Sequence, residues 1–561
     1  MRARVQFAGV FAVLLAAVPA LRAADEGWCG TTAEGSREAL ALHAWAAAAG
    51  HPDTSSAHAA SSAQAAAPAD LDVDHVALLD DRNDLVIRRN PFDLDSRAVR
   101  LQPNAAGGYD PVPLALPLDA PGAALAVAEE GAVAVDLPFA FPLYGRRHRT
   151  AYVTADGRVL LDSSDTGTGD KGLARMLAGP PSVAAFFADL DPSRGGSITA
   201  TVQADRAAFL WSGVPGGGQI NRNTFEIVLH AGGEIDLVWG TMESRQAVVG
   251  VTPGATLDLA AAHLSAATPR DTGGALLERF SETEKLDLVS VLRRFYAGHP
   301  DSFDQVVVYT TRPLNPIPGT LAFEINVKNA VTGIGLDGSD DSAAWGSAGA
   351  LESVVYMDAV DQYLATDGFE FLGHEVGHRW GARLRFRDLG GTSLALLGRA
   401  IVHWSFFLDS QASVLEGNAI RDLGGGRFET VDFTRRYSAL DQYAMGLRGP
   451  GEVPPFFYVE GADEFRPSRG YKAGSTPEAG VSFTGVRRDI RIDQVIAALG
   501  PRLPPAGQAP TLWRQAYVLV SDSGAAATEA RRAAVARIRA HFEPYYRAAT
   551  DGRGEVVTTL H

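Results

Sequence analysis

A His-Glu-x-x-His motif within residues 371–381 constrains this chain more than any other feature. It consists of His374, Glu375 and His378, and a helix is the conformation that gives this spacing a chemical use. At 3.6 residues per turn, the two histidines lie one above the other on one face and could grip a single metal ion. Zn²⁺ lowers the pKa of a bound water to about 7, and Glu375 is placed to take its proton. The motif therefore predicts a hydrolytic zinc site.

The third ligand has to come from further along the chain, because a catalytic zinc takes three protein ligands and keeps one position open. Gly381 predicts that the motif helix ends there in the left-handed conformation. The motif resembles the metzincin pattern, which has a histidine three residues after this glycine, but here that residue is Leu384. The next histidine is His403, and apart from the motif pair it is the only one between His299 and His541. His403 is the first candidate for the third ligand.

Residues 281–448 resemble the leishmanolysin-type metzincins, a family of zinc peptidases in which an insertion separates this glycine from the third histidine. The resemblance rests mainly on the eight residues from His374 to Gly381. It implies that His374, His378 and His403 bind zinc and that Glu375 is the general base.

The same resemblance implies two further elements near the metal. A tight turn would pass below it at residues 414–416, and a closing helix would begin at the N-cap Ser438. The family has a methionine in that turn, whereas this chain has Leu415. Met445 is the other candidate for the turn residue, although it lies inside the predicted helix.

A rival ligand set resembles that of the gluzincins, in which a glutamate on a second helix is the third ligand. Glu416 is the candidate for that role. A glycine and an asparagine follow it directly, which is typical of a turn rather than a helix, and this favours His403. Tyr437 and Tyr443 are candidates to donate a hydrogen bond to the oxygen that becomes negative during the reaction.

The length and charge of the chain limit what else it can be. With 561 residues it is too long for one core, so two to four domains are expected. The formal net charge of −16 argues against a nucleic-acid partner, because phosphate contacts need clustered Lys and Arg. Cys29 is the single cysteine, which excludes an internal disulfide framework and any zinc site built from several thiolates.

The N-terminus indicates export. Residues 1–23 have a basic start, an apolar run and small residues at the end, as a signal peptide does, with cleavage expected close to Ala23. No stretch reaches 18 unbroken apolar residues, so we expect no membrane span. Residues 24–68 are rich in Ala and Ser, which predicts a linker or a propeptide. We expect a secreted, extracellular or periplasmic protein.

Residues 69–265 carry the signals of an antiparallel β-sandwich. Residues 151–161 predict a hairpin around Asp-Gly, and residues 225–229 are expected to pair with residues 234–238. Residues 139–145 and 185–192 resemble the nidogen-type β-sandwich modules of secreted proteins.

Two acidic residues within this segment offer a possible Ca²⁺ contact. Asp189 and Asp191 lie in one loop, although an acidic loop is usually only solvated.

The catalytic region is predicted at residues 281–448. A capping box at residues 281–284 is expected to open a helix that ends at Gly298. Strands are predicted at residues 305–310, 321–327 and 353–357, ahead of the motif helix.

A mixed extension, residues 449–561, is expected to pack on this region. It includes a short helix at 492–499 and a longer one at 529–543 that Pro544 would stop. The predicted fold is thus multidomain: an N-terminal β-sandwich, an α+β metzincin-like zinc peptidase domain, and a mixed helical C-terminal extension.

We expect a secreted zinc endopeptidase that acts on proteins or peptides. The alternatives are a non-catalytic surface or adhesion protein with a structural or vestigial zinc site, and a zinc hydrolase of a non-peptide amide or ester. The presence of Glu375 beside the ligands favours catalysis, since a vestigial site has no need of it.

Overall fold

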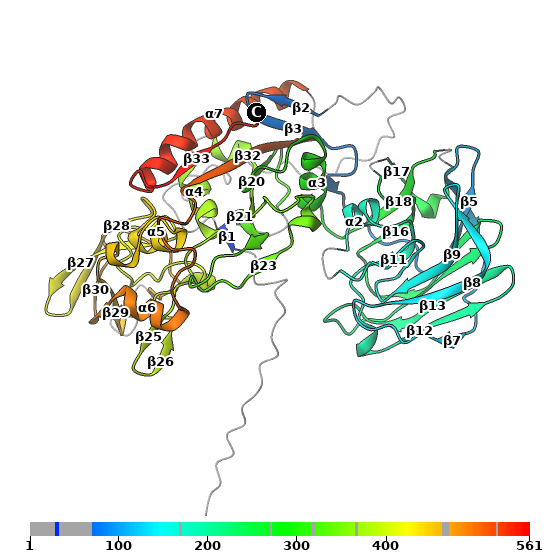
Figure 1. Ribbon diagram of the computed structural model, residues 1–561, viewed down its shortest axis with the longest axis horizontal. Helices are drawn as coiled ribbons and strands as arrows, with labels where there is room; N and C mark the ends of the chain where they lie inside the picture. Colours follow the sequence, from blue (N-terminus) through cyan, green and yellow to red (C-terminus); the bar gives the residue numbers. More distant parts are fainter. Residues whose placement is uncertain are drawn as a thin grey trace, which may run out of the picture.

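The computed structural model describes residues 29–32, 70–167, 171–256, 258–269, 272–315, 320–364, 368–462, 470–522 and 525–561. The protein is multidomain and consists mostly of β-sheets with few helices (Figure 1). The predicted signal peptide 1–23 lies outside the described residues, as does all of the predicted linker 24–68 except residues 29–32.

Two seven-stranded sheets form the β-sandwich, on the right of Figure 1. Their strands alternate between inward apolar residues and outward polar ones, and the inward residues of both sheets share one core. One sheet has the order β17 (Leu259–Ala261), β18 (Ala275–Phe280), β16 (Ala247–Thr252), β11 (Ser182–Phe187), β10 (Arg158–Leu160), β9 (Arg146–Thr154), β8 (Ala132–Leu143). The other has the order β6 (Tyr109–Leu114), β5 (Ala98–Pro103), β15 (Ile235–Met242), β14 (Asn223–His230), β13 (Arg206–Val214), β12 (Ser197–Val202), β7 (Ala123–Ala124).

Both predicted hairpins are present, because Asp-Gly and Gly-Gly turns are local signals. β9 pairs with β10, and β14 pairs with β15. The short helix α2 (Leu173–Ala178) lies against the outer side of β11 and β16.

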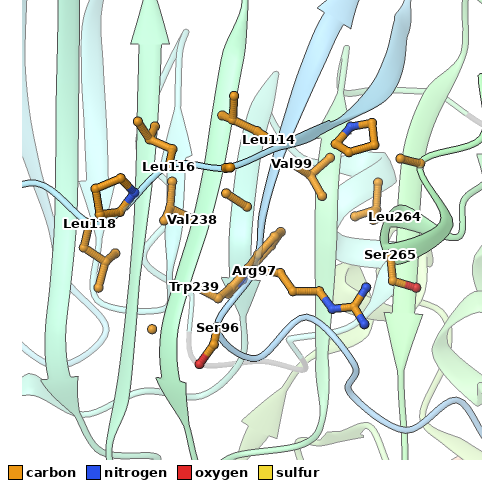
Figure 2. A pocket seen from close by; sticks show the side chains of 16 residues that line it. Ser96, Arg97, Val99, Leu114, Leu116, Leu118, Val238, Trp239, Leu264 and Ser265 are labelled. Atoms are coloured by element: carbon orange, nitrogen blue, oxygen red, sulfur yellow. The ribbon is translucent and has the colours of Figure 1, made fainter.

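An open cavity of about 570 Å³ lies along one side of the sandwich (Figure 2). Apolar side chains such as Leu114, Val238 and Trp239 line most of it, and the exposed Arg97 stands at its edge. Every residue that lines it belongs to the sandwich, so this cavity is separate from the predicted metal site.

A mixed eight-stranded sheet, the central sheet, carries the metal-site half of the molecule, on the left of Figure 1. Its inner strands run parallel and its outer pairs, at both edges, antiparallel. The order is β1 (Cys29–Thr32), β21 (Thr320–Asn326), β24 (Ser353–Ala359), β20 (Gln305–Thr310), β32 (Leu512–Ser521), β3 (Val76–Asp80), β2 (Leu71–Val73), with β33 (Glu555–Val557) also paired to β32.

The central sheet is buried on both faces, as its nearly unbroken apolar strands require. In β20, Val307 and Tyr309 pack toward the helices α4 (Phe369–His378) and α7 (Ala525–Ala549). Val306 and Val308 point the other way, toward α3 (Leu288–Gly298). The sheet therefore separates two cores, and the motif helix belongs to the larger one.

The domain boundaries predicted from the sequence are wrong at three places. The predicted sandwich of residues 69–265 includes β2 and β3, which belong to the central sheet, and omits β18, which belongs to the sandwich. β1 lies within the predicted linker and pairs with β21. β32, from the predicted extension 449–561, pairs with β20 on one side and β3 on the other, so that segment is part of the sheet and not an addition to it. These pairings join residues hundreds of positions apart, which local patterns cannot show.

Two predicted helix boundaries also differ. α3 begins after Asp287, whose carboxylate accepts from the Ser290 amide, and not at residue 281. The intervening β19 (Lys285–Leu286) pairs instead with β4 (Val86–Ile87). α7 continues through Pro544 to Ala549, because its last turns are buried in the larger core. α6 (Ile492–Leu499) has the predicted bounds.

Smaller elements complete this half. They are α5 (Ala439–Met445), the pairs β22 (Lys328–Asn329) with β23 (Ser339–Asp340), β25 (Phe386–Asp388) with β26 (Gly391–Ser393), and β29 (Phe456–Glu460) with β31 (Val486–Ile490), and the sheet β27 (Asn418–Gly424), β28 (Arg427–Phe433), β30 (Ser482–Thr484). A small aromatic cluster that includes Phe406, Phe428 and Phe483 holds the last of these sheets together.

Candidate metal centre

Three histidine rings converge at the end of α4. The Nε2 atom of His374 lies 2.9 Å from Nε2 of His378 and 3.2 Å from Nε2 of His403. Nitrogens that share one tetrahedral zinc are separated by about 3.4 Å, so these separations fit one ion. Among the described residues, this is the one group of three or more histidine, cysteine or acidic side chains whose ligand atoms gather closely enough to hold a metal.

Backbone carbonyls orient two of the rings. His374 donates from Nδ1 to the carbonyl of Val414 at 2.9 Å, and His403 donates from Nδ1 to the carbonyl of Arg399 at 2.9 Å. A carbonyl oxygen can only accept, so the proton stays on Nδ1 and the lone pair of Nε2 faces the centre of the group. This is the tautomer that a metal ligand needs.

Burial keeps the three imidazoles neutral at pH 7. His378 and His403 are fully buried and His374 is 4% exposed. Burial lowers the pKa of His374 to about 4 and that of His403 to about 3, and it lowers the pKa of His378 well below its usual value. The lone pairs are therefore available to a metal without the loss of protons.

Glu375 lies beside His374 on α4 and is fully buried. It is about 100° round the helix from that histidine, since each residue turns the helix by this angle. Glu375 therefore does not project in the same direction as the two histidines, but from the adjacent side of the helix.

The predicted turn at residues 414–416 passes next to α4. Its Leu415 side chain lies against two glycines of the motif: a Cβ at Gly377 would be 3.1 Å from Leu415 Cδ2, and one at Gly381 would be 2.4 Å from Cδ1. The predicted left-handed conformation at Gly381 is wrong, since its φ is outside that range. A glycine is needed at position 381 because Leu415 leaves no room for a Cβ atom. Leu415 is the turn residue at which the resemblance implies a methionine. Met445 lies in α5.

A buried carboxylate joins the segments that carry the third histidine and the turn. Asp441 accepts from the indole Nε1 of Trp404 at 2.8 Å, from the Ser413 hydroxyl at 2.6 Å and from the Ser438 amide at 2.7 Å. Ser438 caps α5 in return, so the predicted start of this helix is confirmed. Because Trp404 directly follows His403, this network holds the His403 ring in place.

Glu416 does not join the three-histidine group. It forms a two-point ion pair with Arg399, with Nη2 2.5 Å from Oε1 and Nε 3.1 Å from Oε2, while its Oε1 is 3.7 Å from Nε2 of His403. Burial raises the pKa of Glu416, but the charge interactions with His403 and Arg399 outweigh it, and the pKa falls to about 2.

Arg399 is a residue beside the histidines that sequence reasoning misses. Its Nη2 also lies 2.9 Å from Nε2 of His403. The only sequence signal for this contact is that Arg399 lies four residues before His403. That spacing predicts a contact only when the conformation of the turn between the two residues is known.

The hydroxyls of both predicted tyrosines bond to backbone groups. Tyr437 is fully buried and donates to the carbonyl of Gly373 inside α4. The Tyr443 hydroxyl accepts from the amide of Arg502. These contacts tie α4 and α5 to their surroundings and do not support the predicted oxyanion role.

The predicted Ca²⁺ contact also finds a simpler explanation. Asp191 accepts from the amide and the hydroxyl of Ser193 and so caps a short 3₁₀ turn, while Asp189 is exposed. Neither residue belongs to a cluster of metal-binding groups within the described part of the chain.

Comparisons with known proteins add no assignment. In the described part of the chain, no helix has the length and apolar character needed to cross a membrane. No protein-family model, no curated protein and no solved structure matches this chain.

Proposed function

We propose that this protein is an exported zinc-dependent endopeptidase whose metal is held by His374, His378 and His403. The observation that carries the proposal is the convergence of three neutral, buried Nε2 atoms next to a buried glutamate. Imidazole nitrogen is a preferred ligand of zinc, and three protein ligands leave one position for water or substrate. The resemblance to leishmanolysin-type metzincins supports a peptide as the substrate.

Zinc in such a site supplies a Lewis acid that lowers the pKa of water and polarises a carbonyl group. The protein supplies the rest. The hydrogen bonds from Nδ1 of His374 and His403 to backbone carbonyls hold two ligands in register before the metal arrives. Burial excludes bulk water from the histidines and from Glu375.

Glu375 would be the general base and then the general acid. Its carboxylate takes one proton from the water that attacks the scissile carbonyl, and gives the same proton to the nitrogen of the leaving amine. The carbon–nitrogen bond breaks, a carboxylic acid and an amine leave, and Glu375 returns to its starting state.

The test is cleavage of casein or a mixed peptide library by the purified, zinc-loaded protein. Glu375→Gln keeps the shape but cannot take the proton, so kcat should fall by about 10²–10⁴-fold while zinc stays bound. Glu370→Gln, the same change earlier in α4, is the matched control and should retain activity. If the wild type with full zinc cuts nothing, the adhesion or non-peptide alternative replaces this proposal.

A further inference from the structure

A guanidinium group stands directly beside the metal-facing atoms. Nη2 of Arg399 lies 2.9 Å from Nε2 of His403, the atom that would bind the metal. The same Nη2, together with Nε, is paired with the two carboxylate oxygens of Glu416. A permanent positive charge is thus fixed within one hydrogen bond of the ligand set.

The backbone around this pair is strained. Ala400 and Ile401, which follow Arg399, have φ values of 53° and 60°, and Glu416 has a φ of 58°. Positive φ is uncommon for residues other than glycine and is an outlier for a β-branched residue such as isoleucine. Such strain persists only where the surroundings enforce it, and it clusters at functional sites.

Arg399 is also the charged group nearest to solvent. Its side chain is 24% exposed, whereas Glu416 is 4% exposed and Glu375, His378 and His403 are fully buried. Arg399 is therefore the part of this group of side chains that solvent reaches most.

We propose that Arg399 is a catalytic residue of this site and donates a hydrogen bond to the scissile carbonyl oxygen as that oxygen becomes negative. This role rests on the proposed function. When Nε2 of His403 binds a metal, it can no longer accept from Nη2, while Nε and Nη2 of Arg399 stay paired with the two carboxylate oxygens of Glu416. The ion pair then holds the guanidinium beside the metal, where the N–H of Nη2 that faces His403 in this structure can turn to a carbonyl oxygen. A fixed donor aimed at developing charge typically contributes about 10²–10³-fold to kcat.

The same geometry makes Arg399 a competitor of the metal. Its positive charge and its hydrogen bond both oppose a cation at Nε2 of His403. We expect Arg399→Met to bind zinc about tenfold more tightly than the wild type, measured by competition with a chelator. Arg399→Lys, which keeps the charge, should stay near the wild type.

Arg399→Met removes the ion-pair partner of the buried Glu416 carboxylate, and this could itself change zinc affinity. A double variant controls for that effect. Arg399→Met with Glu416→Gln removes both charges, so its zinc affinity should return close to that of the wild type. If Glu416 were instead a ligand, the double variant would bind zinc much more weakly, and that result would overturn the assignment of the pair.

Turnover supplies the second readout. With zinc saturating, Arg399→Met should lose about 10²-fold in kcat with little change in KM, and guanidinium ions added to Arg399→Ala should restore part of the loss. Arg385→Met, an exposed arginine on the same insertion, is the matched control and should behave as wild type. An inactive wild type overturns the proposed function and this role with it. An active wild type whose Arg399→Met variant keeps full kcat overturns this role alone.

Discussion

The indole nitrogen of Trp404 donates a hydrogen bond of 2.8 Å to the carboxylate of Asp441, 37 residues further along the chain. The same carboxylate holds the turn through Ser413 and the start of α5 through Ser438. The third histidine, the turn and the closing helix are thereby tied to one buried group.

Asp441→Ala should destabilise the protein by about 3 kcal/mol or more, because three buried donors lose their acceptor at about 1–3 kcal/mol each. Zinc affinity should also fall by about 10–100-fold, as it does when groups that orient a ligand are removed. Urea unfolding and chelator competition measure the two effects. Asp432→Ala, a partly exposed aspartate on β28, is the control and should change stability by less than about 0.5 kcal/mol. An Asp441→Ala variant as stable as the wild type would refute this account of the network.

Gly381 and Leu415 should be coupled. Gly381→Ala introduces a methyl group 2.4 Å from Leu415 Cδ1, so we expect a loss of about 2 kcal/mol from overpacking. Leu415→Ala alone should lose about 3 kcal/mol through the cavity it leaves. In the double variant the new methyl has room, and the loss should be smaller than the sum of the two single losses. Strict additivity in a double-mutant cycle would show that the two residues do not touch.

The stability of the sandwich should fall as the pH rises through neutrality. Burial raises the pKa of Glu226 to about 7, so this group favours the folded state below its unfolded pKa, near 4.5, and loses that contribution as the pH rises through about 7. Glu226→Gln should therefore stabilise the protein at pH 8 by an amount on the order of 2 kcal/mol and change it little at pH 4.

The check on Glu226 is chemical unfolding at both pH values, followed by the fluorescence of the sandwich tryptophans. Glu243→Gln, an exposed glutamate of the same sandwich, should show no such pH-dependent gain. A Glu226→Gln variant whose advantage is equal at pH 4 and pH 8 would mean that ionisation of Glu226 is not the cause.

Local signals predicted much of the fold. The strand Gln305–Thr310 and the helix Ile492–Leu499 follow from apolar periodicity within a few residues. The start of α5 at Ser438 was implied by the resemblance, and capping chemistry explains it. The assembly of the central sheet could not be predicted in this way, because the sandwich and the metal site lie between β3 and β32 in the sequence.

The candidate site also combines residues that local signals predict with residues that they do not. His374, Glu375 and His378 are recognisable because the spacing is local, and His403 because histidines are rare in that part of the chain. The direction of the tyrosine hydroxyls could not be predicted because it depends on packing, and the hydroxyl of Tyr437 donates to the Gly373 carbonyl of α4. Arg399 was missed because the role proposed for it depends on its contacts with His403 and with Glu416, which is 17 residues further along the chain.

The most direct test of the central claim is the metal content of purified protein after saturation with zinc and removal of the excess. The account predicts one zinc per chain in the wild type, retention of that zinc in Glu416→Gln, and its loss in His403→Ala. Stoichiometric zinc in His403→Ala, with loss only when Glu416 is changed, would contradict the three-histidine centre.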